Sequence, residues 1–120
     1  MKYMLLIYGN EAVWNSLAAD FEQVVADTEA LQKELRASGE FICAYGVADQ
    51  VQARTVTLKD GQPVVSDGPY IEAKEYLGSF DVIDCAGLER ALEIAARIPF
   101  ARYGTVEVRP LHAESDSNTP

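Results

Sequence analysis

The chain begins with an apolar run that has no polar face. From Tyr3 to Tyr8 every residue is aliphatic or aromatic, and Gly9-Asn10 ends the run. A strand that is apolar on both sides is buried on both sides. We therefore expect residues 2–8 to form a strand that needs cover on each of its two faces.

Two later segments carry apolar residues at steps of three and four, which is the pattern of a helix with one buried face. We expect the first helix to start at a cap on Asn15 or Ser16 and to end before Gly39. The second is expected over residues 88–98, where Pro99 stops it. The predicted buried stripes are Leu17, Phe21, Val24, Val25, Thr28, Leu31 and Leu35 in the first helix, and Leu88, Ala91, Leu92, Ala95 and Ile98 in the second.

Further strands are expected over residues 41–47, 76–84 and 105–109. The last of these alternates cleanly, with Val106 and Val108 on one side and polar residues on the other. Such alternation is typical of a strand with one face on a core.

A β-hairpin is predicted in the middle of the chain. Residues 54–58 and 63–66 have strand character, and Asp60-Gly61 between them is a strong turn signal. The predicted order is therefore strand, helix, strand, hairpin, strand, helix, strand. This order indicates an α+β fold, a ferredoxin-like βαββαβ sandwich with an inserted β-hairpin.

Helices cover only one face of such a sheet, so the second face of the first strand needs another cover. We expect a second copy of the chain there, which gives a homodimer with two sheets packed together. The alternative is a monomer whose hairpin or tail folds over the open face. The domain is expected over residues 1–111, followed by a disordered tail at 112–120 that is rich in Ser, Asp and Asn.

Composition narrows the class of protein. The 120 residues fit one domain, and the formal net charge is −9. Lys and Arg are scattered without a basic stripe, so direct binding to nucleic acid is not expected. Cys43 and Cys85 lie in apolar stretches and are predicted to be small buried hydrophobes, with no disulfide or zinc site. The first apolar run is too short for a membrane span or a signal sequence, which indicates a cytoplasmic protein.

The turn at Asp67-Gly68-Pro69 is the best candidate for chemistry. Pro69 restricts the backbone and Gly68 permits a tight turn, directly before several ionisable side chains. Asp67 is the candidate general base or ligand acceptor. Its alternative role is an Asx turn that only shapes the exit from the hairpin.

Other side chains are candidates for the lining of a cleft around Asp67. Glu72 and Lys74 share one face if their segment is extended, although Lys74 has the alternative of a surface ion pair with Glu72 or Glu75. Tyr70 offers a phenol, or else packs as an aromatic ring.

The sheet itself supplies further candidates. Tyr3 and Tyr8 must lie on opposite faces of the first strand, so one of them faces the second copy. If Val106 and Val108 meet the helices, Glu107 and Arg109 face the interior of the dimer. Tyr8, Glu107 and Arg109 are therefore candidate cleft residues, and Arg54 and Asp81 are weaker ones.

Three separated motifs resemble one protein family. They are Asp67-Gly68-Pro69-Tyr70 with Glu72, Lys74-Glu75 and Leu77-Gly78, the opening run of residues 2–8, and residues 95–99 with 104–110. Together they resemble the DGPF-domain proteins of the YCII-related group, in the dimeric α/β-barrel superfamily. The resemblance covers residues 1 to about 111, and it implies a ferredoxin-like protomer whose sheets pair into a dimeric α/β barrel.

The resemblance implies less about activity. Relatives are suspected of carrying a His–Asp pair in a cleft, and the Asp of that pair maps onto Asp67. The chain's only histidine is His112, in the predicted tail, so the His has no match. DGPF proteins often accompany extracytoplasmic-function sigma factors, which implies contact with a sigma factor or another regulator.

Two hypotheses for function follow. One is a small-molecule-binding or accessory homodimer. The other is a small dimeric enzyme that performs acid–base chemistry on an organic substrate, with Asp67 as base and Lys74 or Arg109 stabilising negative charge. The chain has no phosphate loop, no metal-ligand spacing and no Ser-His-Asp arrangement, so neither a metal nor a cofactor is expected.

Overall fold

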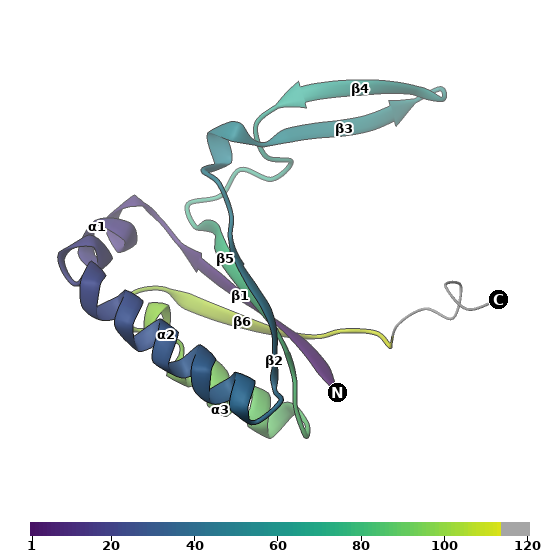
Figure 1. Ribbon diagram of the computed structural model, residues 1–120. Helices are drawn as coiled ribbons and strands as arrows, with labels where there is room; N and C mark the ends of the chain where they lie inside the picture. The colour runs from purple at the N-terminus through teal and green to yellow at the C-terminus, as the bar shows by residue number, and fades with distance from the viewer. Residues whose placement is uncertain (114–120) are drawn as a thin grey trace.

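The computed structural model describes residues 1–113, which form an α+β fold (Figure 1). The predicted tail lies outside the described residues from position 114 onward. The strands and helices are β1 (Lys2–Gly9), α1 (Glu11–Ala19), α2 (Phe21–Ala37), β2 (Phe41–Gly46), β3 (Arg54–Lys59), β4 (Gln62–Asp67), β5 (Tyr76–Asp84), α3 (Leu88–Arg97) and β6 (Thr105–Pro110), with short 3-10 helices at η1 (Gln50–Gln52) and η2 (Pro99–Arg102).

The main sheet has four strands in the order β2-β5-β1-β6, and each neighbouring pair is antiparallel. This arrangement is compatible with a ferredoxin-like fold. Helices α2 and α3 lie on one face of the sheet, as Figure 1 shows. The sequence pattern predicted each of these strands to within about one or two residues.

The core lies between this face and the helices. On β1, Tyr3, Leu5 and Ile7 are buried, while the residues between them are only half-buried. Ile83 of β5 is opposite Tyr3 and is also fully buried. The apolar side chains that complete this core include Leu31, Leu35, Ala91, Ile94, Ala95 and Ile98.

The opposite face of the sheet, here called the open face, has no helix over it. Strand register places on it residues from all four strands, including Lys2, Met4, Leu6, Tyr8, Cys43, Tyr45, Leu77, Phe80, Val82, Asp84, Thr105, Glu107 and Arg109. Val106 and Val108 pack against the core, so Glu107 and Arg109 point away from the helices, as expected. The second apolar side of β1 is therefore only half-covered within one chain.

The helix after β1 begins earlier than expected. Asn10, not Asn15 or Ser16, is the cap, because its side-chain oxygen accepts a hydrogen bond from the Val13 N–H at 2.9 Å. The predicted single helix is also two helices, which meet at Asp20.

The predicted buried stripes need correction as well. Phe21 and Val25 of α2, and Leu88 and Leu92 of α3, are exposed. The residues in and directly after α3 that belong to the core are Ala91, Ile94, Ala95 and Ile98. Ala91, Ala95 and Ile98 belong to the predicted stripe, so the period was right, and Ile94 is buried in place of Leu88 and Leu92.

Arg90 of α3 forms an ion pair with Glu40, the residue directly before β2. Its guanidinium makes two hydrogen bonds of 2.9 Å to the Glu40 carboxylate. These bonds, with a third from the Ser38 hydroxyl, lower the pKa of Glu40 to about 2. A second pair, Arg97 with Glu34, connects α3 to α2.

The predicted hairpin is β3 and β4, joined at Asp60 and Gly61, which both have positive φ. Positive φ at both central residues is the geometry of a type I′ turn, which Asp-Gly favours. The two strands pair only with each other and project away from the main sheet, so the hairpin does not fold over the open face of its own chain (Figure 1). We call residues 54–67 the arm.

Cys85 is buried, as predicted, whereas Cys43 is half-buried on the open face; both are free thiols. Within residues 1–113, no helix is both long and apolar enough to cross a membrane.

Candidate functional site

The turn after the arm is anchored by backbone hydrogen bonds. Gly68 has a φ of +85°, which favours glycine, and its N–H donates to the Ala53 carbonyl at 2.8 Å. The Thr55 hydroxyl donates to the Gly68 carbonyl at 2.9 Å. The two ends of the arm are therefore held together at its base.

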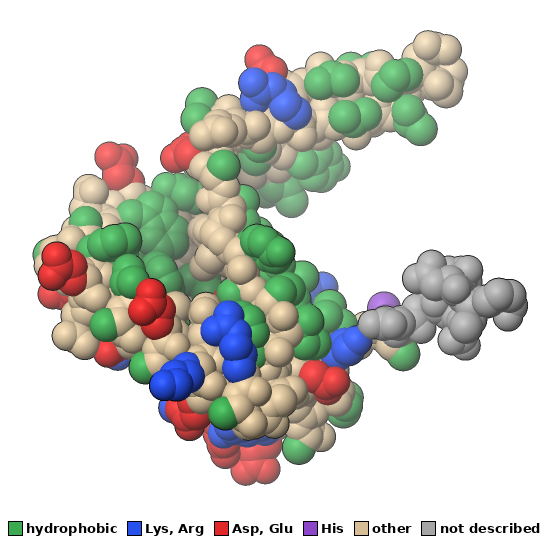
Figure 2. Space-filling view, viewed as in Figure 1, with side chains coloured by type: hydrophobic (Ala, Val, Ile, Leu, Met, Phe, Trp, Pro, Cys, Tyr) green, Lys and Arg blue, Asp and Glu red, His purple; other side chains and the backbone are tan. Residues whose placement is uncertain are grey.

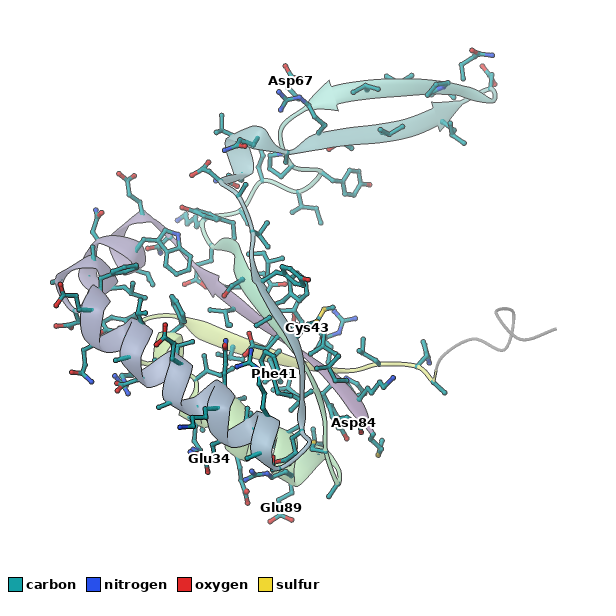
Figure 3. All side chains as sticks on the ribbon, in the orientation of Figure 1. Glu34, Phe41, Cys43, Asp67, Asp84 and Glu89 are labelled. Atoms are coloured by element: carbon teal, nitrogen blue, oxygen red, sulfur yellow. The ribbon has the colours of Figure 1, made fainter. Side chains whose placement is uncertain are left out.

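Asp67 does not form the Asx turn considered from the sequence. Its carboxylate instead pairs with Arg54, directly across the arm, at 3.1 Å. The Asp67 side chain is 91% exposed. Figure 3 shows it on the arm, well away from Cys43 on the main sheet.

The other candidates after this turn are also exposed. Tyr70 is 83% exposed, and Glu72 and Lys74 lie in an irregular segment with bends. Because this segment is not extended, the argument that Glu72 and Lys74 share a face does not apply. The segment nevertheless contributes to a cavity through two neighbours, Pro69 and Ile71.

Tyr8, Glu107 and Arg109 do come together, on the open face. The Tyr8 hydroxyl donates a hydrogen bond of 3.4 Å to a Glu107 carboxylate oxygen. Burial raises the pKa of Tyr8, the charge of Glu107 and this hydrogen bond raise it further, and Arg109 opposes them. The phenol is therefore held in its protonated, donating form.

Two adjacent cavities lie where β2 and β5 approach the arm. The first has a volume of about 410 Å³ and the second about 320 Å³. Both are lined mainly by apolar groups, with a few polar groups from side chains and backbone. The walls common to both are Val47, Ala48, Asp49, Tyr76 and Leu77.

The first cavity reaches the base of the arm. Ala53, directly before β3, and Pro69, directly after the turn that follows β4, are both in its wall. Asp49 caps η1 by accepting a hydrogen bond from the Val51 N–H at 2.9 Å. That bond occupies one carboxylate oxygen and leaves the other available to a ligand.

Trp14 forms a wall of the second cavity. Its indole covers Gly9 and Gly78, where an added Cβ would lie 2.6 and 2.7 Å from the ring. The indole N–H donates to the Tyr76 hydroxyl at 3.2 Å, and the two rings meet edge to face. Since Tyr76 accepts from Trp14, its own hydroxyl proton is available for a ligand.

Sequence reasoning did not find Trp14, Tyr76 or Asp49. The available signal was the chain's only tryptophan, together with Gly9 directly after the first expected strand and Gly78 within the strand expected over residues 76–84. Glycines beside a large ring often mark a close approach.

Asp81 is the most perturbed carboxyl group of the sheet. Register places it on the helix side, opposite Leu5 and Ala44, and not on the open face where it was a weaker candidate. Burial raises its pKa to about 6. It follows Ser79, a wall residue of the second cavity, along the same side of β5.

Among residues 1–113, no group of three or more His, Cys, Asp or Glu side chains is arranged to hold a metal ion.

Comparison with known proteins gives a family without an assigned activity. A family model described as the YCII-related domain matches residues 1–114. The chain is also 34% identical over 114 residues to an uncharacterized protein of Rhizobium meliloti (strain 1021), a match that covers 92% of each chain.

Proposed function

The chain belongs to the YCII-related family, and from that premise we propose that it is a homodimer that binds a small, largely apolar organic molecule. The observation that carries the binding proposal is the pair of adjacent cavities with five common wall residues. Their volumes and their mixture of apolar walls with few polar groups are typical of small-molecule sites.

The walls suggest the chemistry of the ligand. The apolar walls favour an aliphatic or aromatic body. The free proton of the Tyr76 hydroxyl suits an acceptor such as a carbonyl or ether oxygen, and Asp49 suits a donor. A neutral molecule with one acceptor and one donor would satisfy both groups.

The homodimer is supported by the open face. This face carries apolar and aromatic side chains, among them Tyr45 and Phe80, whose rings are 6.0 Å apart. Apolar patches on small proteins commonly mark interfaces. A second copy on this face would pair the sheets as a dimeric α/β barrel, and would enclose Tyr8, Glu107 and Arg109.

Acid–base catalysis by Asp67 has less support. Asp67 is paired with Arg54 and lies outside the walls of both cavities. Contact with a sigma factor stays a prediction from the resemblance.

We expect that replacing Tyr76 by phenylalanine weakens ligand binding by about tenfold, because one hydrogen bond is worth roughly 1–1.5 kcal/mol. A thermal-shift screen of neutral metabolites identifies a ligand, and calorimetry then gives its affinity for each variant. Tyr70→Phe is the matched control, since it removes the same hydroxyl from an exposed ring outside the cavity walls.

A cavity-filling change tests the location independently. Ala48→Leu adds three carbons to a wall common to both cavities and is expected to abolish binding. A ligand that binds equally well to wild type, Tyr76→Phe and Ala48→Leu would refute the site.

A further inference from the structure

The arm has an apolar face that nothing within the described chain covers. Register places Val56 opposite Val65 and Leu58 opposite Pro63 on this face. Val56, Leu58 and Val65 are 61%, 69% and 64% exposed. Figure 2 shows hydrophobic side chains gathered along the arm. A two-stranded hairpin is only marginally stable in water by itself, so we expect this face to be covered by a partner.

The overall dimensions also indicate that one chain exposes surface that a partner could cover. The radius of gyration is 16.7 Å, whereas a compact chain of this length has roughly 13.6 Å. The accessible surface is 8382 Å², whereas a compact protein of this mass exposes roughly 6,400 Å². The excess is larger than the roughly 800 Å² that each partner buries in a stable complex.

Charge favours a second copy as that partner. The arm contains two basic and two acidic residues, namely Arg54, Lys59, Asp60 and Asp67, and is therefore neutral. The open face carries Glu107 together with Arg109. The net charge of −9 therefore lies elsewhere on the chain, so two copies that meet through these surfaces avoid most of their mutual repulsion.

The direction of the arm brings these surfaces together. In Figure 1 the helices lie on one side of the main sheet, and the arm extends beyond the sheet toward the other side. In Figure 2 the molecule is hollowed between the arm and the sheet. A copy placed on the open face would therefore lie within reach of the arm.

We propose that the arm of each protomer packs its apolar face, made of Val56, Leu58, Pro63 and Val65, against the second copy, so that each protomer clasps the other. This proposal rests on the homodimer proposed above and adds a second area of contact to it. The arm is then a clasp between copies, and its exposed apolar side chains become part of the interface.

The clasp also links the dimer to the ligand site. Ala53 and Pro69, at the two ends of the arm's base, are both in the wall of the first cavity. The position of the arm on the second copy therefore sets the position of these walls. Ligand binding and dimerisation are then coupled, and each changes the affinity of the other by the same factor.

Site-specific photo-crosslinking tests the clasp on the full chain. A benzophenone amino acid replaces Leu58 on the apolar face of the arm, Thr57 on its opposite face, or Tyr45 on the open face of the sheet. We expect irradiation to give covalent dimers when the crosslinker is at position 58 or 45. We expect no covalent dimer when it is at position 57. Thr57 is the matched control because it lies one residue away on the same strand.

The pattern of crosslinking shows which of the two proposed contacts with the second copy forms, that of the arm or that of the open face. Crosslinking from position 45 alone overturns the clasp and leaves the sheet-to-sheet dimer standing. Equal crosslinking from positions 57 and 58 overturns the assigned face of the arm. No crosslinking from any position overturns both proposals.

A second variant measures the contribution of the same face. Val56→Asp with Leu58→Asp is expected to raise the dimer dissociation constant by about 100-fold or more, because two apolar contacts are lost. The control with Thr57→Asp and Gln62→Asp places two charges on the other face and leaves the constant unchanged. A dissociation constant that is equal in both variants contradicts the clasp.

Discussion

Replacing Asp81 by asparagine is expected to stabilise the protein by about 2 kcal/mol at pH 8, and to have little effect near pH 4. The cause is burial, which raises the pKa of this carboxyl group from 3.8 to about 6. Between pH 3.8 and about pH 6 the folded state therefore keeps the proton on Asp81, while the unfolded state releases it. Stability falls as the pH rises through this window, and above pH 6 the folded state contains a desolvated charge.

Asparagine has nearly the same shape and no charge, so it removes this penalty. Chemical denaturation at several pH values between 4 and 8 measures the effect. Asp67→Asn is the matched control, because the same change at an exposed carboxylate should shift stability by less than about 1 kcal/mol. A gain that does not depend on pH, or a loss at pH 8, would contradict the role given to burial.

Replacing Gly104 by alanine is expected to destabilise the protein by about 3 kcal/mol. An added Cβ at this position would lie 2.3 Å from the backbone carbonyl oxygen of Tyr8. A backbone oxygen cannot rotate away as a side chain can, so the change forces β1 and β6 apart where Tyr8 pairs with Thr105.

Gly46→Ala is the matched control for this change. Nothing lies within 4 Å of an added Cβ there, and the backbone φ is not positive, so the variant should match the wild type or exceed its stability slightly. Thermal unfolding of both variants measures the difference. Equal stability of the two alanine variants would show that β1 and β6 are not as close at Gly104 as described.

The strands and the arm could be predicted because their signals are local. The apolar run of β1, the alternation in β6 and the Asp60-Gly61 turn each specify an element within a few residues. The first helix was predicted too late because Asn15 and Ser16 are equally good caps in sequence. Only the structure shows that Asn10 accepts the hydrogen bond from Val13.

The candidate site was harder to predict because its walls are distant in sequence. Trp14 is positioned by Gly9 and Gly78, which lie on different strands. The ionisable residues after the arm are closely spaced in sequence and were therefore predicted as the site, yet Tyr70 is exposed and only Pro69 and Ile71 of that segment line a cavity. Residue type pointed to the segment beside the first cavity, whereas backbone direction decided which of its side chains line that cavity.

The covering of the open face by a second copy is the central claim, and the mass of the protein in solution tests it most directly. Sedimentation equilibrium of the full chain at micromolar concentration should give about 26 kDa, twice the 13.2 kDa of one chain. A mass of one chain across that concentration range, with Tyr45 and Phe80 still open to water, would contradict the account.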